Sequence, residues 1–189
     1  MKKISLEIDG KKVEVEPGTT ILEAAQQVGI EIPTLCHDEK LKPYGCCRFC
    51  SVEITKGEQT EVVASCCYPA EEGLTVKTNS ERINKIRKTI LELLLPLAPN
   101  CKCRSLVEEY GARGDRFPLN QEPTDCICCG KCVRYCREVK KANVIGFIGR
   151  GVDREVALVP GKEDYCLFCR ECFDLCDGGK IVKLVEKRA

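Results

Sequence analysis

Two short stretches of the chain are unusually dense in cysteine, and they decide the fold of its C-terminal part. Residues 126–136 read CICCGKCVRYC, and residues 166–176 read CLFCRECFDLC. Both contain the pattern C-x2-C-x2-C-x3-C. Cysteines two or three positions apart rarely offer disulfide geometry. In a reducing compartment, such close and repeated spacing indicates metal binding.

The spacing favours two [4Fe-4S] clusters. A C-x2-C-x2-C loop supplies three thiolates to one cluster, and in two-cluster ferredoxins the fourth cysteine of each run ligates the other cluster. The spacing therefore assigns Cys126, Cys129, Cys132 and Cys176 to a first cluster and Cys166, Cys169, Cys172 and Cys136 to a second. Structural zinc is the alternative, but it usually takes two separated C-x2-C pairs. Cys128 breaks the spacing and is expected to be a neighbour of the first cluster.

The second run departs from the usual sequence at its end. Cys176 is followed by Asp177, where runs of this kind have proline. Reduction adds negative charge to a cluster, and a nearby carboxylate opposes this by Coulomb repulsion. We therefore expect Asp177 to lower the reduction potential of one cluster.

A different cysteine pattern lies nearer the N-terminus. Cys36, Cys47, Cys50 and Cys66 follow C-x10-C-x2-C-x15-C. Plant-type [2Fe-2S] ferredoxins use C-x4-C-x2-C followed by a distant fourth cysteine, so only the first gap differs. We expect a [2Fe-2S] cluster here, with Cys46 and Cys67 as spare thiols, although the sequence leaves a one-residue swap open. His37, the only histidine, is expected to be a hydrogen-bonding neighbour.

The pattern around these four cysteines predicts a small α+β domain. Alternating segments on either side of Asp9-Gly10 indicate a hairpin. Thr20 and Glu23 form the signature of a capping box, which predicts a helix that ends near Gly29. Further strands are expected over residues 48–54, 61–66 and 73–78. This order of elements predicts an N-terminal β-grasp [2Fe-2S] ferredoxin-like domain.

The rest of the chain is expected to contain a short helical middle segment and a C-terminal bacterial-type 2[4Fe-4S] ferredoxin domain. Asn79 or Ser80 caps a predicted helix, which Pro96 stops. Its apolar stripe, Ile83, Ile86, Ile90, Leu93 and Leu94, is expected to pack between neighbouring domains. The predicted divisions are residues 1–78, 79–120 and 121–189.

Charge and hydropathy exclude several functions. Lys plus Arg number 30 and Asp plus Glu 29, so there is no basic excess for nucleic acid or a membrane surface. The N-terminus lacks the apolar region of a signal peptide, and the apolar stretch at residues 90–98 is too short to span a bilayer. We expect a cytoplasmic protein. No nucleotide-binding fingerprint is present, and no catalytic residue is expected on this chain.

Four segments resemble a known family: LCHDEKLKPYGCCRFCSVEI (35–54), VASCCYPA (63–70), CVRYCREV (132–139) and IGFIGRG (145–151). They are similar to the N-terminal iron–sulfur region of the large complex I subunit. The same region occurs in diaphorase iron–sulfur subunits of NAD-linked hydrogenases and in electron-bifurcating oxidoreductases. The resemblance implies the same [2Fe-2S] ligands as the spacing. The family also has a third cubane, held in the middle segment by one histidine and three cysteines. Here Leu97 replaces the histidine and only Cys101 and Cys103 remain, so we expect that cluster to be lost.

The resemblance also implies a function. It predicts an electron-transfer subunit that relays single electrons between an NADH-oxidising, FMN-type flavoprotein and a separate catalytic subunit. That subunit would be a flavoprotein, a hydrogenase or a formate dehydrogenase, with ferredoxin as a further partner and electron bifurcation as the expected mode. The alternative is a free, diffusible multi-cluster ferredoxin. Such carriers are usually acidic, which speeds docking, whereas this chain has a net charge of +1.

Overall fold

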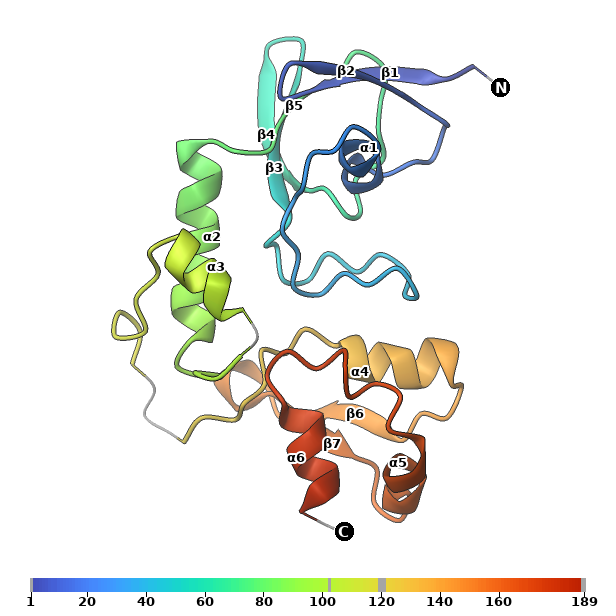
Figure 1. The fold of residues 1–189 in the computed structure, drawn as a ribbon, viewed down its shortest axis with the longest axis vertical. Helices are drawn as coiled ribbons and strands as arrows, with labels where there is room; N and C mark the ends of the chain where they lie inside the picture. The colour runs from blue at the N-terminus through green and yellow to red at the C-terminus, as the bar shows by residue number, and fades with distance from the viewer. Residues whose placement is uncertain (1, 102, 119–121, 188–189) are drawn as a thin grey trace. The chain divides into compact units, whose positions relative to one another are not determined.

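The structure, a computed structural model, describes residues 2–101, 103–118 and 122–187 (Figure 1). The chain forms two compact units. The first unit comprises Met1–His37 and Pro43–Ile90, and the second comprises Asp38–Lys42 and Leu91–Ala189. The division into three sequence segments stays a prediction, and its boundary at residues 120 and 121 lies outside the described residues.

The first unit is built on a five-stranded mixed sheet. Its strands are β1 (Ile4–Ile8), β2 (Lys11–Val15), β3 (Ser51–Lys56), β4 (Gln59–Ala64) and β5 (Thr75–Lys77). They lie in the order β2-β1-β5-β3-β4, and β1 and β5 are parallel. The predicted hairpin at Asp9-Gly10 is present, with both residues at positive φ. Alternate residues of β1 and β2, such as Ile8 and Val15, enter the core.

One helix, α1 (Ile21–Gln27), completes the core of the first unit (Figure 1). The predicted capping box is confirmed: the Glu23 amide donates to Thr20 Oγ1 at 3.2 Å, and the Thr20 amide donates to a Glu23 carboxylate oxygen at 2.7 Å. Ile21 and Leu22 are buried in the same core as the apolar face of the sheet. A mixed sheet with a packed helix confirms the predicted α+β class.

Helix α2 (Glu81–Leu94) begins as predicted but buries a different face. The Ile83 amide donates to Ser80 Oγ at 3.2 Å, so Ser80 is the cap. The buried residues are Ile83, Arg87, Leu91 and Glu92. Leu93 is 49% exposed, so its assignment to the buried stripe was wrong. The physical reason is that Arg87 turns inward, where its guanidinium donates to the carbonyl oxygens of Phe49 and Ser51 at 3.1 and 3.0 Å.

The second unit has short elements. They are α3 (Arg104–Glu109), α4 (Lys131–Arg134) with the π-helical turn η1 (Tyr135–Val139), β6 (Ile145–Ile148), the 3-10 turn η2 (Gly151–Asp153), β7 (Glu155–Leu158), α5 (Glu163–Cys169) and α6 (Lys180–Glu186). Strands β6 and β7 form an antiparallel hairpin. Sulfur contributes much of the core, because Cys126, Cys132, Cys136, Cys166 and Cys172 are buried together with Ile181 and Val185. Across residues 2–101, 103–118 and 122–187, no helix is long and apolar enough to cross a membrane.

Candidate iron–sulfur sites

A first hollow in the second unit is lined by cysteines from both dense runs. Cys126, Cys129 and Cys132 come from the first run, and Cys176 comes from the end of the second. The walls of this hollow include the apolar side chains of Val156, Leu175 and Ile181. The structure therefore brings together the four residues that the spacing assigned to the first cluster.

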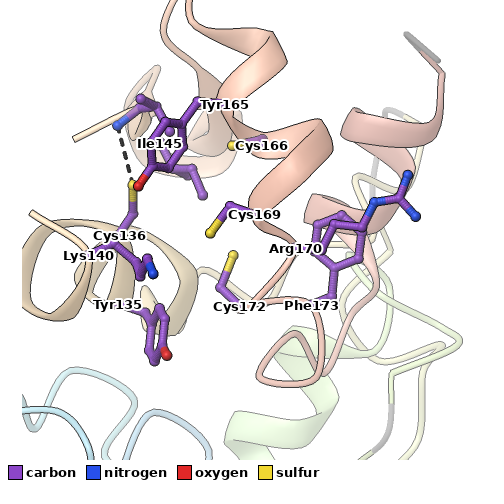
Figure 2. A pocket seen from close by; sticks show the side chains of 11 residues that line it. Tyr135, Cys136, Lys140, Ile145, Tyr165, Cys166, Cys169, Arg170, Cys172 and Phe173 are labelled. Carbon is purple, nitrogen blue, oxygen red and sulfur yellow. Dashed lines mark hydrogen bonds between the residues drawn. The ribbon is translucent and has the colours of Figure 1, made fainter. Parts of the chain in front are cut away.

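A second hollow is lined by the other four cysteines, as Figure 2 shows. Cys166 and Cys169 belong to α5, Cys172 follows that helix, and Cys136 comes from η1. The sulfur atoms of Cys169 and Cys172 point toward one another (Figure 2). The Val144 amide donates to the sulfur of Cys136 at 3.3 Å, which orients this thiol.

Left-handed backbone at matching positions makes the two cysteine loops tight. Gly130 follows Cys129 and has φ 74, whereas Arg170 follows Cys169 and has φ 51. Glycine adopts this conformation without steric cost, but arginine does so at some cost. Each loop thereby turns directly after its second cysteine, so that the third cysteine lies on the same side as the first two.

Glycine is required where the end of the second run passes the start of the first. A Cβ atom on Gly178 would lie 2.1 Å from the carbonyl oxygen of Asp125. Asp125 directly precedes Cys126, and Gly178 lies two residues after Cys176. The close approach of these two backbones therefore brings the fourth cysteine of one run to the first cysteine of the other.

Burial makes four thiols of the two hollows, Cys129, Cys132, Cys166 and Cys172, hard to ionise. Burial raises the pKa of Cys129 to about 12, that of Cys166 to about 11 and that of Cys172 to about 12. Burial also raises the pKa of Cys132, and thiolate charges on neighbouring cysteines raise it further. Cys126 differs, because hydrogen bonding from Cys128 lowers its pKa to about 6. Thiolates bind metal as anions, so four sulfur ligands around one hollow need positive charge between them, and the donor set of each hollow fits an iron–sulfur cluster.

An ion pair lies beside the first hollow. Lys131 Nζ contacts a carboxylate oxygen of Asp177 at 2.7 Å, and the two side chains are only 11% and 19% exposed. Burial alone would lower the pKa of Lys131, but its hydrogen bond to Asp177 and the charge of that carboxylate raise it. Asp177 lines the hollow, as its place in the sequence suggested, but its charge is paired. This partner was not foreseen from the sequence, because 46 positions separate the two residues.

The cysteines expected to bind the [2Fe-2S] cluster gather in the first unit as two pairs. The sulfur atoms of Cys50 and Cys66 lie 3.3 Å apart. The thiol of Cys36 hydrogen-bonds to that of Cys47. Cys50, Cys66 and Cys36 are each 1% exposed. The hydrogen bond between Cys50 and Cys66 lowers the pKa of Cys50 and raises that of Cys66, so the pair shares one proton.

Both spare thiols touch this group. Cys67 Sγ lies 3.5 Å from Cys66 Sγ, and hydrogen bonding with Cys46 raises the pKa of Cys36. Gly45 leaves room for Cys67, because a Cβ atom there would lie 2.8 Å from its sulfur. Each spare thiol therefore lies beside a proposed ligand, and the choice between each ligand and its neighbour stays a prediction.

The middle segment presents no pair of thiolates. Cys101 and Cys103 are joined by a disulfide bond, and both are 4% exposed. Leu97, in the place of the family's histidine, accepts a hydrogen bond on its carbonyl oxygen from the Asp125 amide at 2.9 Å. The segment therefore packs beside the start of the first run. Across the described parts of the chain, no three His, Cys, Asp or Glu side chains are arranged around a single ion.

Comparison with known proteins supports this account. Residues 1–81 match the 2Fe-2S iron-sulfur cluster binding domain family. The chain is 37% identical over 203 residues to the NADPH-Fe(3+) oxidoreductase subunit alpha of Geobacter sulfurreducens, covering 95% of this chain and 24% of that protein. It is 34% identical to the NADH-ubiquinone oxidoreductase 75 kDa subunit of Reclinomonas americana, covering 94% of this chain and 29% of that protein.

A solved structure is also similar, that of an NAD+-reducing [NiFe]-hydrogenase in the H2-reduced state. The TM-score is 0.70 at 28% identity, and the match covers 84% of this chain and 76% of the hydrogenase chain. The chain spans about a quarter of the length of the curated relatives described above. The predicted resemblance to the large complex I subunit and to NAD-linked hydrogenases is confirmed, and residues 1–81 match the model of the 2Fe-2S iron-sulfur cluster binding domain.

Proposed function

We propose that this chain is an electron-transfer iron–sulfur subunit of a multisubunit NAD(P)H-linked oxidoreductase. It would hold one [2Fe-2S] cluster and two [4Fe-4S] clusters and relay single electrons between a flavoprotein subunit and a separate catalytic subunit. When bound, each cluster takes up and releases one electron. The protein's contribution is to hold the thiolates, exclude water from them and set the charge around them.

One observation carries the proposal. Two hollows in the second unit are each lined by four cysteines, three from one run and one from the other. This exchange of the fourth ligand is the arrangement of two-cluster ferredoxins. The proposed ligands are Cys126, Cys129, Cys132 and Cys176 in the first hollow and Cys166, Cys169, Cys172 and Cys136 in the second. For the [2Fe-2S] cluster we propose Cys36, Cys47, Cys50 and Cys66, because they form two close pairs.

We further propose that the middle segment binds no cluster. Its remaining cysteines, Cys101 and Cys103, form a disulfide, which leaves neither sulfur available as a thiolate. A leucine replaces the expected histidine ligand. Electrons would then bypass this segment, unlike in relatives that retain a third cubane there.

The partners are proposed from the names of the relatives. Those names describe oxidoreductases that use NADPH with Fe(3+), NADH with ubiquinone, or NAD+ in a hydrogenase. An NADH-oxidising, FMN-type flavoprotein would therefore supply or accept electrons, and a flavoprotein, hydrogenase or formate dehydrogenase would lie at the other end. Flavin-based electron bifurcation, with ferredoxin as a further partner, is the mode that we propose for the complex, in the cytoplasm.

The test is anaerobic purification of the tagged chain from its own cells, followed by addition of NADH or NADPH. We expect a flavin-containing complex in which the visible absorption of the iron–sulfur clusters bleaches when the nucleotide is added. A matched control uses the chain alone, whose sequence contains no nucleotide-binding fingerprint, and which should not bleach. A chain that elutes only near 21.1 kDa without flavin would instead support a diffusible ferredoxin.

A further inference from the structure

The two cysteine runs carry opposite charges at matching positions. Lys131 directly precedes the third cysteine of the first run, Cys132, and Glu171 directly precedes the third cysteine of the second run, Cys172. Each of these side chains contacts residues near the end of the other run, where the fourth cysteine lies. Each hollow is therefore lined by four cysteines, but the residue before the third cysteine of the run is a lysine at the first hollow and a glutamate at the second.

At the first hollow, the contact is a largely buried ion pair. Lys131 Nζ meets the Asp177 carboxylate at 2.7 Å, with the side chains 11% and 19% exposed. Lys131 lies between Cys129 and Cys132, and Asp177 directly follows Cys176. This single contact therefore connects the loop that bears three of the proposed ligands to the segment that bears the fourth.

Other charges near this pair are themselves paired or more distant. The charge of the Asp38 carboxylate also raises the pKa of Lys131. Lys180 lines the same hollow and contacts Glu155 at 2.6 Å. Asp125 contacts Lys183 at 2.6 Å. Lys131 and Asp177 are therefore the pair in which both members adjoin the proposed ligand runs.

At the second hollow, the corresponding contact is more open to solvent. The Glu171 carboxylate accepts hydrogen bonds from Lys140 Nζ at 2.5 Å and from the Tyr135 hydroxyl at 3.0 Å. The side chains of Lys140 and Glu171 are 30% and 44% exposed. Water screens charges at such exposure, so this pair has a weaker electrostatic effect than the first pair.

We propose that Lys131 and Asp177 form a matched pair that sets the reduction potential of the first [4Fe-4S] site and holds Cys176 in its ligand position. The inference rests on the proposed function, since it requires a cluster in the first hollow. A positive charge beside the site favours the reduced, more negative state, and a carboxylate disfavours it. The lysine therefore offsets the fall in potential that an unpaired Asp177 would cause. Both act as positioning residues.

The test compares Lys131→Met, Asp177→Asn and the double variant with the wild-type chain. Iron and sulfide are counted first, and each [4Fe-4S] potential is then measured by a redox titration followed by electron paramagnetic resonance. We expect the potential of the first site to fall in Lys131→Met, to rise in Asp177→Asn and to return close to the wild-type value in the double variant. The second site should not shift. Lys140→Met is the matched control. It should lower the reduction potential of the second site only, and by less than Lys131→Met lowers that of the first site.

The outcomes separate an electrostatic role from a structural one. Shifts of the same sign in the two single variants, or no shift at full iron content, would overturn the inference. If Lys131→Met loses four irons, Lys131→Arg decides, because arginine can keep the ion pair with Asp177: restored iron supports the positioning role, and continued loss of iron refutes it. A wild-type chain without two [4Fe-4S] signals would instead refute the proposed function.

Discussion

The cores of the two units of this chain differ in the side chains that they bury. Among the described residues, the main hydrophobic cluster of the first unit contains eighteen buried residues, of which two, Cys50 and Cys66, are cysteines. The core of the second unit contains twelve, of which five are cysteines. The first unit therefore buries ordinary apolar side chains between a sheet and a helix, whereas the second unit surrounds two hollows lined by thiols.

This difference indicates which of the two units needs iron in order to fold. Burial of aliphatic side chains stabilises a domain without any ligand, at about 25 cal/mol per Å² of apolar surface. Domains whose ligands lie in the core instead gain their folding free energy largely from metal binding. The first unit should therefore be a folded domain with a cluster attached, and the second unit should fold around its clusters.

The largest expected effect is that of iron removal. Anaerobic chelation should unfold the second unit, because its two hollows would lose the clusters that its cysteines are proposed to bind, and with them the binding free energy that stabilises the fold. The first unit should keep its sheet and α1. Hydrogen exchange followed by mass spectrometry measures both in one sample: we expect protection to be lost in β6, β7 and α6 and retained in β1 and β3. If the whole apo-protein retains its far-UV circular dichroism and melts cooperatively, the second unit folds without iron and this prediction is wrong.

A smaller and more local effect is expected from Gly178→Ala. The added methyl group would meet the Asp125 carbonyl at 2.1 Å, so the backbones that bring Cys176 to Cys126 would move apart. We expect loss of the first [4Fe-4S] cluster, about four irons per chain, and retention of the [2Fe-2S] signal. Gly146→Ala is the control, because a Cβ atom there meets nothing within 4 Å. Full iron content in Gly178→Ala would refute the close approach.

The first unit should respond to the loss of polar contacts in its core. Arg87→Met removes the guanidinium that donates to the carbonyls of Phe49 and Ser51. Buried carbonyls without their charged donor should cost about 2–3 kcal/mol in free energy of unfolding. Arg82→Met on the same helix is the control: its side chain is 62% exposed and its ion pair spans 3.9 Å, so the cost should stay within about 0.5 kcal/mol. Equal effects in denaturant titrations would contradict this account.

The smallest effect is expected at the cap of α1. Thr20→Ala removes the side-chain acceptor of the capping box and should lower the free energy of unfolding of the first unit by about 1 kcal/mol. Thr20→Ser keeps the hydroxyl and should restore most of the loss. A thermal melt of the apo-protein isolates this effect, provided that the first unit is the part that melts cooperatively. An unchanged melting temperature in Thr20→Ala would show that the capping box contributes nothing to the stability of the first unit.

Local signals in the sequence were good guides to this fold. The hairpin at Asp9-Gly10, the capping box of Thr20 and Glu23, and the Ser80 cap each depend on neighbouring residues, and all are present. Cysteine spacing also predicted which thiols gather, because the fourth-ligand exchange of two-cluster ferredoxins follows from a fixed pattern. The assignment of each thiol as a ligand still awaits measurement.

Features that depend on distant partners could not be predicted. The buried face of α2 was misplaced because apolar periodicity gives no signal for a buried arginine, and Arg87 finds its acceptors 36 and 38 positions away. The Lys131–Asp177 pair spans 46 positions. Asp177 could be noticed only as a departure from proline, and its sign of charge suggested a lower potential. The disulfide between Cys101 and Cys103 was also missed, since neighbouring cysteines rarely pair.

The most direct test of the central claim is a count of iron and acid-labile sulfide per chain after anaerobic purification, with an electron paramagnetic resonance spectrum of the reduced protein. The account predicts about ten irons, from one [2Fe-2S] and two [4Fe-4S] clusters, with matching sulfide and no zinc. About fourteen irons would mean that a third cubane survives in the middle segment, with Cys101 and Cys103 as ligands. Bound zinc without sulfide would contradict the electron-transfer function itself.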